Sequence, residues 1–132
     1  MNALSRFVEL AKGEPRADYA VVYLEEAHPT NGWMYPAVEH HIVQHTVVAE
    51  RVAAAQILRR ELDKLRAEEI PVYVDNMDNE ASRMFGALPE RLAIVLDGKV
   101  EFIGGRGPED YSIPQASEAL AAILDDLHKK GQ

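Results

Sequence analysis

The stretch Leu92-Ala-Ile-Val-Leu-Asp-Gly-Lys-Val-Glu-Phe-Ile103 decides the fold class. Two strand-like runs flank the pair Asp97-Gly98, and Asp-Gly is favoured in two-residue turns because both positions take positive φ. The stretch therefore predicts an antiparallel β-hairpin. A turn region rich in Gly and Pro follows from Gly104 to Tyr111, and the apolar spacing after it predicts a closing amphipathic helix from Ser117 to Lys130.

Upstream of the hairpin, helical and strand-like patterns alternate. Apolar residues at helical spacing predict a helix over residues 2–12 and a long helix over residues 46–67. The run Tyr19–Leu24 is continuous and apolar, which is typical of a strand buried on both faces. Pro71–Asp75 predicts a second strand, and a short helix ending near Phe85 is expected after it. Asp78 or Asn79 is the expected cap of that short helix, and the long helix is expected to bury one stripe: Val48, Val52, Ala55, Leu58, Leu62 and Leu65.

Composition limits the function classes. The 132 residues are 47% apolar and 27% charged, which is typical of a single globular domain spanning residues 1–132. The net charge of −8 argues against nucleic acid and anionic membranes as partners. No apolar run approaches the ~20 residues that span a bilayer, so a cytoplasmic location is expected. The chain has no cysteine, which excludes disulfides, zinc–thiolate sites and cysteine catalysis from these residues.

Several segments, in order and nearly in spacing, resemble the iodothyronine deiodinase family. They are Val22-Tyr-Leu-Glu-Glu-Ala-His28 with Gly32-Trp33; His45 with Glu50-Arg51-Val52 and Ala54-Ala55-Gln-Ile-Leu58; Pro71-Val-Tyr-Val-Asp75 with Met77; Leu88-Pro-Glu-Arg-Leu92; and Gly104-Gly-Arg-Gly-Pro108 with Tyr111. Each segment alone is a weak signal. Their combination over residues 1–128 identifies the chain as a member of the family, here expected to be a soluble bacterial relative.

The resemblance implies an α/β, thioredoxin-like fold with a mixed sheet, a C-terminal β-hairpin and flanking helices. In the family a selenocysteine, sometimes a cysteine, ends a central strand within Ser-Cys-Thr-Sec-Pro-Pro-Phe-Met or a close variant. Aligning Phe7 with the family's helix aromatic places Met1 on the last residue of that motif. The expectation is a chain that starts after the first central strand and the nucleophile. An in-frame selenocysteine codon upstream, read as a stop, is the hypothesis for this start.

The resemblance also implies roles for five residues. Glu26 and His28 correspond to a family pair that shuttles a proton, and His28 is expected to bind the phenolic end of the substrate as well. Trp33 and His45 match further substrate-binding positions. Arg106 matches an arginine that pairs with the substrate's carboxylate in some members. A planar guanidinium group is suited to this contact because it can donate two hydrogen bonds to one carboxylate.

Residue chemistry alone leaves other interpretations of these positions open. Glu25 and Glu26 can be solvated charges at a strand end, and His28 before Pro29 can be a turn residue. The three histidines His40, His41 and His45 suggest a metal, and His41 and His45 are four residues apart. No carboxylate pattern completes a helical zinc site with them, so no metal site is expected. The sequence Gly104-Gly-Arg-Gly107 can be an anion-binding nest or simply a turn.

The expected activity is that of a deiodinase-like oxidoreductase. Its complete form would reductively dehalogenate an iodinated or other halogenated phenol with thiols as co-substrate and no further cofactor. Without selenocysteine or cysteine the chain as given is expected to be inactive. One alternative is a peroxiredoxin-like peroxide reductase that uses the same nucleophile position. Another is a non-catalytic binding or dimerisation module, because the missing strand predicts either direct pairing of its two neighbours or a homodimer through the gap.

Overall fold

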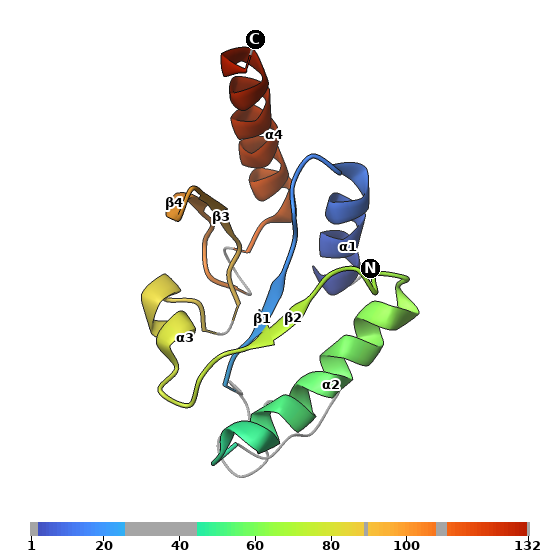
Figure 1. Cartoon of the computed structure of the whole chain (residues 1–132), viewed down its shortest axis with the longest axis vertical. Coiled ribbons are helices and arrows are strands. Elements are labelled where there is room, and N and C mark those ends of the chain that lie inside the picture. Colours follow the sequence, from blue (N-terminus) through green and yellow to red (C-terminus); the bar gives the residue numbers. More distant parts are fainter. Residues whose placement is uncertain (1–2, 26–44, 89, 108–110, 132) are drawn as a thin grey trace. The chain divides into compact units, whose positions relative to one another are not determined.

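The computed structural model describes residues 3–25, 45–88, 90–107 and 111–131 (Figure 1). Its elements, in chain order, are α1 (Ala3–Gly13), β1 (Val21–Tyr23), α2 (Val48–Lys64), β2 (Val72–Val74), α3 (Glu80–Phe85), β3 (Ala93–Leu96), β4 (Lys99–Ile103) and α4 (Ile113–Lys130). The chain forms two compact units. We call them the parallel-sheet unit, Ala20–Pro89, and the hairpin unit, Met1–Tyr19 with Glu90–Gln132.

The parallel-sheet unit is built on β1 and β2, which pair in parallel with Val22 opposite Tyr73. Helix α2 connects the two strands and packs against β2. The core of this unit consists of small and branched apolar side chains: Ala55, Leu62, Ala67, Ile70 and Ala87. The expectation that the first strand is buried on both faces is wrong, because Val22 is 44% exposed beside its exposed partner Tyr73.

The buried side of α2 differs from the expected apolar stripe. Ala55 and Leu62 are buried as expected, but Val48 and Val52 are about half exposed. Arg51 takes the inward position in the first turns and is only 2% exposed. The helix therefore begins with a charged side chain pointing inward, since polar acceptors rather than apolar groups lie opposite this end.

Helix α3 is capped by a residue that the sequence pattern did not indicate. The Asp75 carboxylate accepts hydrogen bonds from the backbone N–H groups of Ala81 and Ser82, each at 2.9 Å. Asn79 occupies the N-cap position in the left-handed region with φ of 56°, and its side chain makes no capping bond. Asn79, one of the two expected caps, is therefore the N-cap residue, but the expected capping bond is not made because its side chain bonds to Arg51 and Glu25 instead.

The hairpin unit confirms the clearest sequence signal. Asp97 and Gly98 have φ of 52° and 77°, as the two-residue turn requires. The ladder pairs Ile94 with Phe102 and Val95 with Val100, and this shift in register marks a β-bulge in β4. Helix α4 packs against α1 and β3, with Val8, Ala116 and Leu120 buried. It begins four residues earlier than expected because the Ser112 hydroxyl caps it by accepting from the Gln115 N–H.

The four strands do not join into the expected mixed sheet in the described residues. They form a parallel pair, β1–β2, and an antiparallel pair, β3–β4. A mixed sheet would need a strand that pairs with both β1 and β3, and the described part of the chain contains none. The alternation of helix and strand confirms the α/β class. None of the described helices is both long and apolar enough to cross a membrane.

Leu62 provides a test of the core. Its side chain has no exposed surface, so Leu62→Ala leaves a cavity in the parallel-sheet unit. We expect the free energy of unfolding in urea to fall by about 2–5 kcal/mol. Met84→Ala is the matched control, because Met84 is 79% exposed and its truncation is expected to change stability by less than about 0.5 kcal/mol. Equal losses in the two variants would contradict this core.

Candidate functional site

Two of the five expected site residues lie among the described residues. His45 belongs to the parallel-sheet unit and Arg106 to the hairpin unit. Glu26, His28 and Trp33 lie outside the described residues, so their expected roles stay predictions. The surroundings of these two residues are therefore described one unit at a time.

His45 is held by a buried arginine. The Nε–H of Arg51 donates to Nδ1 of His45 over 3.1 Å, and the two residues are 2% and 7% exposed. The ring of Tyr23, the last residue of β1, lies against the imidazole with 5.8 Å between centroids. His45 is thus a fixed side chain at the carboxyl end of β1, where open α/β sheets place ligands.

The same guanidinium connects α2 to the loop after β2. Nη1 of Arg51 donates to the Asn76 carbonyl and to Oδ1 of Asn79, each at 2.8 Å. A longer contact of 3.4 Å reaches the Asp75 carbonyl. Among the described residues, every acceptor of this buried cation is uncharged. Burying a charge is costly unless hydrogen bonds satisfy it, so these contacts determine where the loop can lie.

The loop itself is rigid at both ends. The Asp75 carboxylate is tied to α3, and the Asn76 side chain accepts from the Glu80 N–H at 3.1 Å. Asn79 turns into the left-handed conformation, from which Oδ1 accepts from Arg51 while Nδ2 donates to the Glu25 carboxylate at 3.4 Å. We call Glu25, His45, Arg51, Asp75, Asn76 and Asn79 the Arg51 cluster. It connects the ends of β1 and β2 to the start of α2.

The entry into α2 is fixed by Glu50. Its carboxylate accepts from the backbone N–H and the hydroxyl of Thr46, at 2.8 and 2.6 Å, and from the Val47 N–H at 3.2 Å. A glutamate in the first turn that reaches back to the preceding residues is the usual stabiliser of a helix start. Because Thr46 follows His45 directly, the same contacts hold the backbone of His45 in place.

The surroundings of His45 favour its neutral form. Burial lowers the pKa of His45, the positive charge of Arg51 lowers it further, and Glu50 opposes the two with a smaller effect. The ordinary pKa of histidine is about 6.5. The imidazole in this cluster is therefore uncharged at neutral pH.

Arg106 lies on a loop that continues the edge of the β-hairpin. Gly104 N–H donates to the Leu92 carbonyl and Gly107 N–H to the Glu90 carbonyl, both at 2.9 Å. A Cβ on Gly107 would collide with the Glu90 side chain, so only glycine fits there without moving it. Arg106 itself is exposed between these two anchors. An exposed guanidinium on a fixed loop is suited to bind a carboxylate.

The two interpretations of the glycine loop can be compared with its backbone. One form of nest alternates successive residues between right- and left-handed conformations. Neither Gly104 nor Gly107 has a positive φ. These two glycines therefore do not supply the left-handed positions of such a nest, and the choice between a nest and a simple turn stays a prediction.

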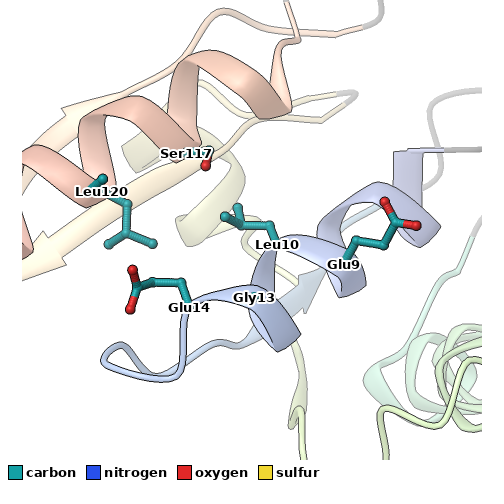
Figure 2. A pocket seen from close by; sticks show the side chains of 7 residues that line it. Glu9, Leu10, Gly13, Glu14, Ser117 and Leu120 are labelled. Carbon is teal, nitrogen blue, oxygen red and sulfur yellow. The ribbon is translucent and has the colours of Figure 1, made fainter.

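The hairpin unit also has an open depression of about 250 Å³ between α1 and α4. Figure 2 shows Leu10 of α1 and Leu120 of α4 facing this space, with Glu14 at one end and Glu9 at the other. Glu14 is bound by Arg16, which also reaches Asp125. Neither His45 nor Arg106, the two expected site residues that the structure describes, is among the residues that line the depression.

A metal centre finds no support in the described residues, which contain no group of three or more His, Asp and Glu side chains able to hold an ion. His40 and His41 lie outside them. Nδ1 of His45 is occupied by the Arg51 donor. That bond already uses one of the two ring nitrogens through which a histidine binds metal.

Sequence reasoning missed the role of Arg51. The apolar pattern of α2 left Arg51 out of the stripe that was expected to be buried. The one available signal was its presence, with Asp75, in the segments that resemble the deiodinase family. Spacing alone offered none, because the acceptors of Arg51 are up to 28 residues away along the chain.

The depressed pKa of His45 predicts how stability depends on pH. The unfolded chain binds the histidine proton more readily than the folded chain. The contribution of His45 to the stability of the fold is therefore complete above the ordinary pKa of about 6.5, and it is lost as the pH falls through the lower pKa of the folded state. We expect the urea midpoint to decrease from pH 7.5 to 5.5. His45→Asn keeps an acceptor near Nδ1 but cannot titrate, so its decrease should be smaller. Equal decreases in both proteins would contradict the neutral His45.

Comparison with known proteins connects these features to a family. The family model described as iodothyronine deiodinase matches residues 1–124. Thyroxine 5-deiodinase of Gallus gallus is 41% identical over 115 residues, or 87% of this chain and 43% of that protein. The Sparus aurata protein is 43% identical over 84% of this chain and the Bos taurus protein 34% over 97%, each match covering 40% of the relative. The chain thus spans about two fifths of the length of these relatives, and it belongs to the iodothyronine deiodinase family.

Proposed function

We propose that this chain is the scaffold of a deiodinase-like oxidoreductase with a thioredoxin-like fold, and that it serves the thiol-dependent removal of iodine from an iodinated phenol. The family match over residues 1–124 is the observation that carries the proposal. The relatives' name, thyroxine 5-deiodinase, supports an iodinated aromatic compound as the substrate class. In the balanced reaction, one aryl iodide and two thiols give the arene, hydrogen iodide and a disulfide.

The reaction needs a soft nucleophile to take the iodine. A selenolate or thiolate combines softness with reversible reduction by thiols. The 132 residues contain no cysteine, and the sulfur of each of the four methionines is already alkylated. We therefore propose that these residues bind the substrate and move the proton, and that by themselves they do not turn over.

The remaining roles follow from the family resemblance. Glu26 and His28 would deliver the proton to the ring carbon, and His28 with Trp33 would bind the phenolic end. His45, held by Arg51 at the end of β1, would supply a further polar contact to the substrate. Arg106, exposed on its anchored loop, would bind a carboxylate at the other end of the substrate through charge-assisted hydrogen bonds.

A chimera tests the activity. The family's central strand, ending in Ser-Cys-Thr-Sec-Pro-Pro-Phe, is joined to Met1, and iodide release from an iodinated phenol with dithiothreitol is measured. We expect turnover with selenocysteine and slower turnover with cysteine at the same position, because the thiolate is the less polarizable nucleophile. The 132-residue chain alone and a chimera with alanine in place of selenocysteine are expected to release no iodide.

Two comparisons sharpen this test. In the active chimera, Arg106→Ala should raise KM about tenfold or more for a substrate with a carboxylate and leave KM unchanged for a phenol without one. Peroxide is then offered in place of the iodophenol. Faster peroxide reduction than iodide release would favour the peroxide reductase instead, and turnover by the chain without any added nucleophile would falsify the proposal.

The outer edge of β1, which pairs with no strand of the described residues, favours a second, non-catalytic function in assembly. Val21 N–H donates to the Pro71 carbonyl and the Tyr23 carbonyl accepts from Asp75 N–H, so the backbone groups of Val22 face the opposite edge of β1. No strand of the described residues pairs there. We propose that this edge pairs with a second copy of the chain, with exposed Val22 and Tyr73 beside the seam.

Light scattering after gel filtration tests the assembly. We expect the chain at about 100 µM to have the mass of a dimer, because this concentration is well above a micromolar Kd for self-association. Val22→Pro removes the N–H that faces the free edge and should give a monomer. Val22→Thr keeps that N–H, so it should remain a dimer. A monomeric wild-type chain at this concentration would rule the assembly out.

A further inference from the structure

The bond between Arg51 and His45 restricts the protonation of the imidazole. A guanidinium has only donors and stays protonated in proteins. Its Nε–H points to Nδ1 of His45 over 3.1 Å, so Nδ1 must offer a lone pair. Both ring nitrogens of an imidazolium are donors, and so is Nδ1 of the Nδ1–H tautomer. Only the neutral ring with its proton on Nε2 fits this contact.

Arg51 cannot easily turn away from His45. It is 2% exposed, and Nη1 is held by the Asn76 carbonyl and by Oδ1 of Asn79, each at 2.8 Å. Asn79 is fixed in turn by its left-handed backbone. Because a guanidinium is planar and rigid, fixing Nη1 also fixes the direction of the Nε–H.

Neither the other charged groups of the Arg51 cluster nor the neighbouring Glu50 competes for the histidine proton. The Asp75 carboxylate accepts from backbone N–H groups at the start of α3. The Glu25 carboxylate accepts from Asn79. Glu50 is occupied by Thr46 and Val47, and its charge favours the protonated ring less strongly than burial and Arg51 oppose it. Arg51 therefore remains the group that determines which nitrogen of His45 is protonated.

We infer that Arg51 is a positioning residue that holds His45 as the neutral Nε2–H tautomer, so that His45 offers a substrate or relay group a hydrogen-bond donor and not a base. The substrate part of this inference rests on the proposed function; the tautomer part does not. Nε2 is a buried atom, so the donor is aimed within the protein and not at bulk water. A fixed neutral donor suits an acceptor atom such as a phenolic oxygen and leaves proton transfer to other residues.

The tautomer can be measured directly on the 132-residue chain. Long-range ¹H–¹⁵N spectra of ¹⁵N-histidine-labelled protein at pH 7.5 distinguish protonated from unprotonated ring nitrogens, and His45→Asn identifies the His45 signals by their loss. We expect an unprotonated Nδ1 and a protonated Nε2. A proton on Nδ1, or an imidazolium at this pH, would overturn the inference.

Matched variants separate positioning from general stability. Arg51→Lys keeps the positive charge, but a single ammonium group cannot donate to His45 and to the Asn76 carbonyl at the same time. His45 should therefore become a mixture of tautomers. Arg59→Lys is the control, because Arg59 of α2 also donates to backbone carbonyls, those of Ala67 and Ile70. It should leave the His45 spectrum unchanged. An unchanged spectrum in Arg51→Lys would contradict the positioning role, and if that variant does not fold, the wild-type spectrum decides.

The measurement is independent of catalysis. An inactive chimera with the expected tautomer would contradict the proposed function only. An active chimera with a proton on Nδ1 would contradict the role of Arg51 only. In an active chimera, Arg51→Lys is expected to raise KM more than it lowers kcat if His45 donates to the bound substrate, whereas a loss of kcat alone would show that His45 acts as a base.

Discussion

The buried charge of Arg51 is the constraint on which the parallel-sheet unit depends. Removing a guanidinium from water is costly, and truncating its partners would leave the cost uncompensated. The chain offsets it by bringing two separate segments to one point: His45, three residues before α2, and the loop after β2, which supplies the Asn76 carbonyl and the side chain of Asn79. Apolar contacts alone would leave these loops free to shift, since hydrophobic burial has no direction. The guanidinium has five donors in a plane, and it therefore fixes orientation as well as distance.

The sequence predicted those parts of the fold that depend on local chemistry. The Asp97-Gly98 turn was predictable because few residue pairs accept positive φ at both positions. Helices α1, α2 and α4 and the strand β2 appeared within a few residues of their predicted places. The exposure of one side of β1 was not predictable from its apolar sequence, because a run of Val and Tyr gives the same pattern whether or not a second layer of structure covers the strand. The number of strands in a sheet was likewise not predictable, because it depends on pairing between segments that are far apart in the sequence.

The candidate site was predictable to a smaller extent. Composition and spacing gave no reason to select His45 or Arg106 from other polar residues, and only the family resemblance did so. The capping of α3 shows why local reasoning fails here. Asn79 has a good capping side chain, but that side chain connects Arg51 to Glu25, and Asp75 caps the helix from a position four residues earlier. A residue with several possible partners takes the one that tertiary structure brings closest, and helical periodicity contains no information about that choice.

The arrangement around His45 also bears on how the proposed deiodinase-like scaffold would divide its chemistry. Taking iodine from an aromatic ring requires a polarizable anion, whereas binding the phenol and supplying a proton require ordinary polar side chains. A histidine that must transfer protons should titrate near the working pH, but burial and the charge of Arg51 lower the pKa of His45. The cluster therefore gives up acid–base capacity at this position and gains a donor of fixed direction. In a buried site such a donor is worth more than in water, because no solvent competes for the acceptor.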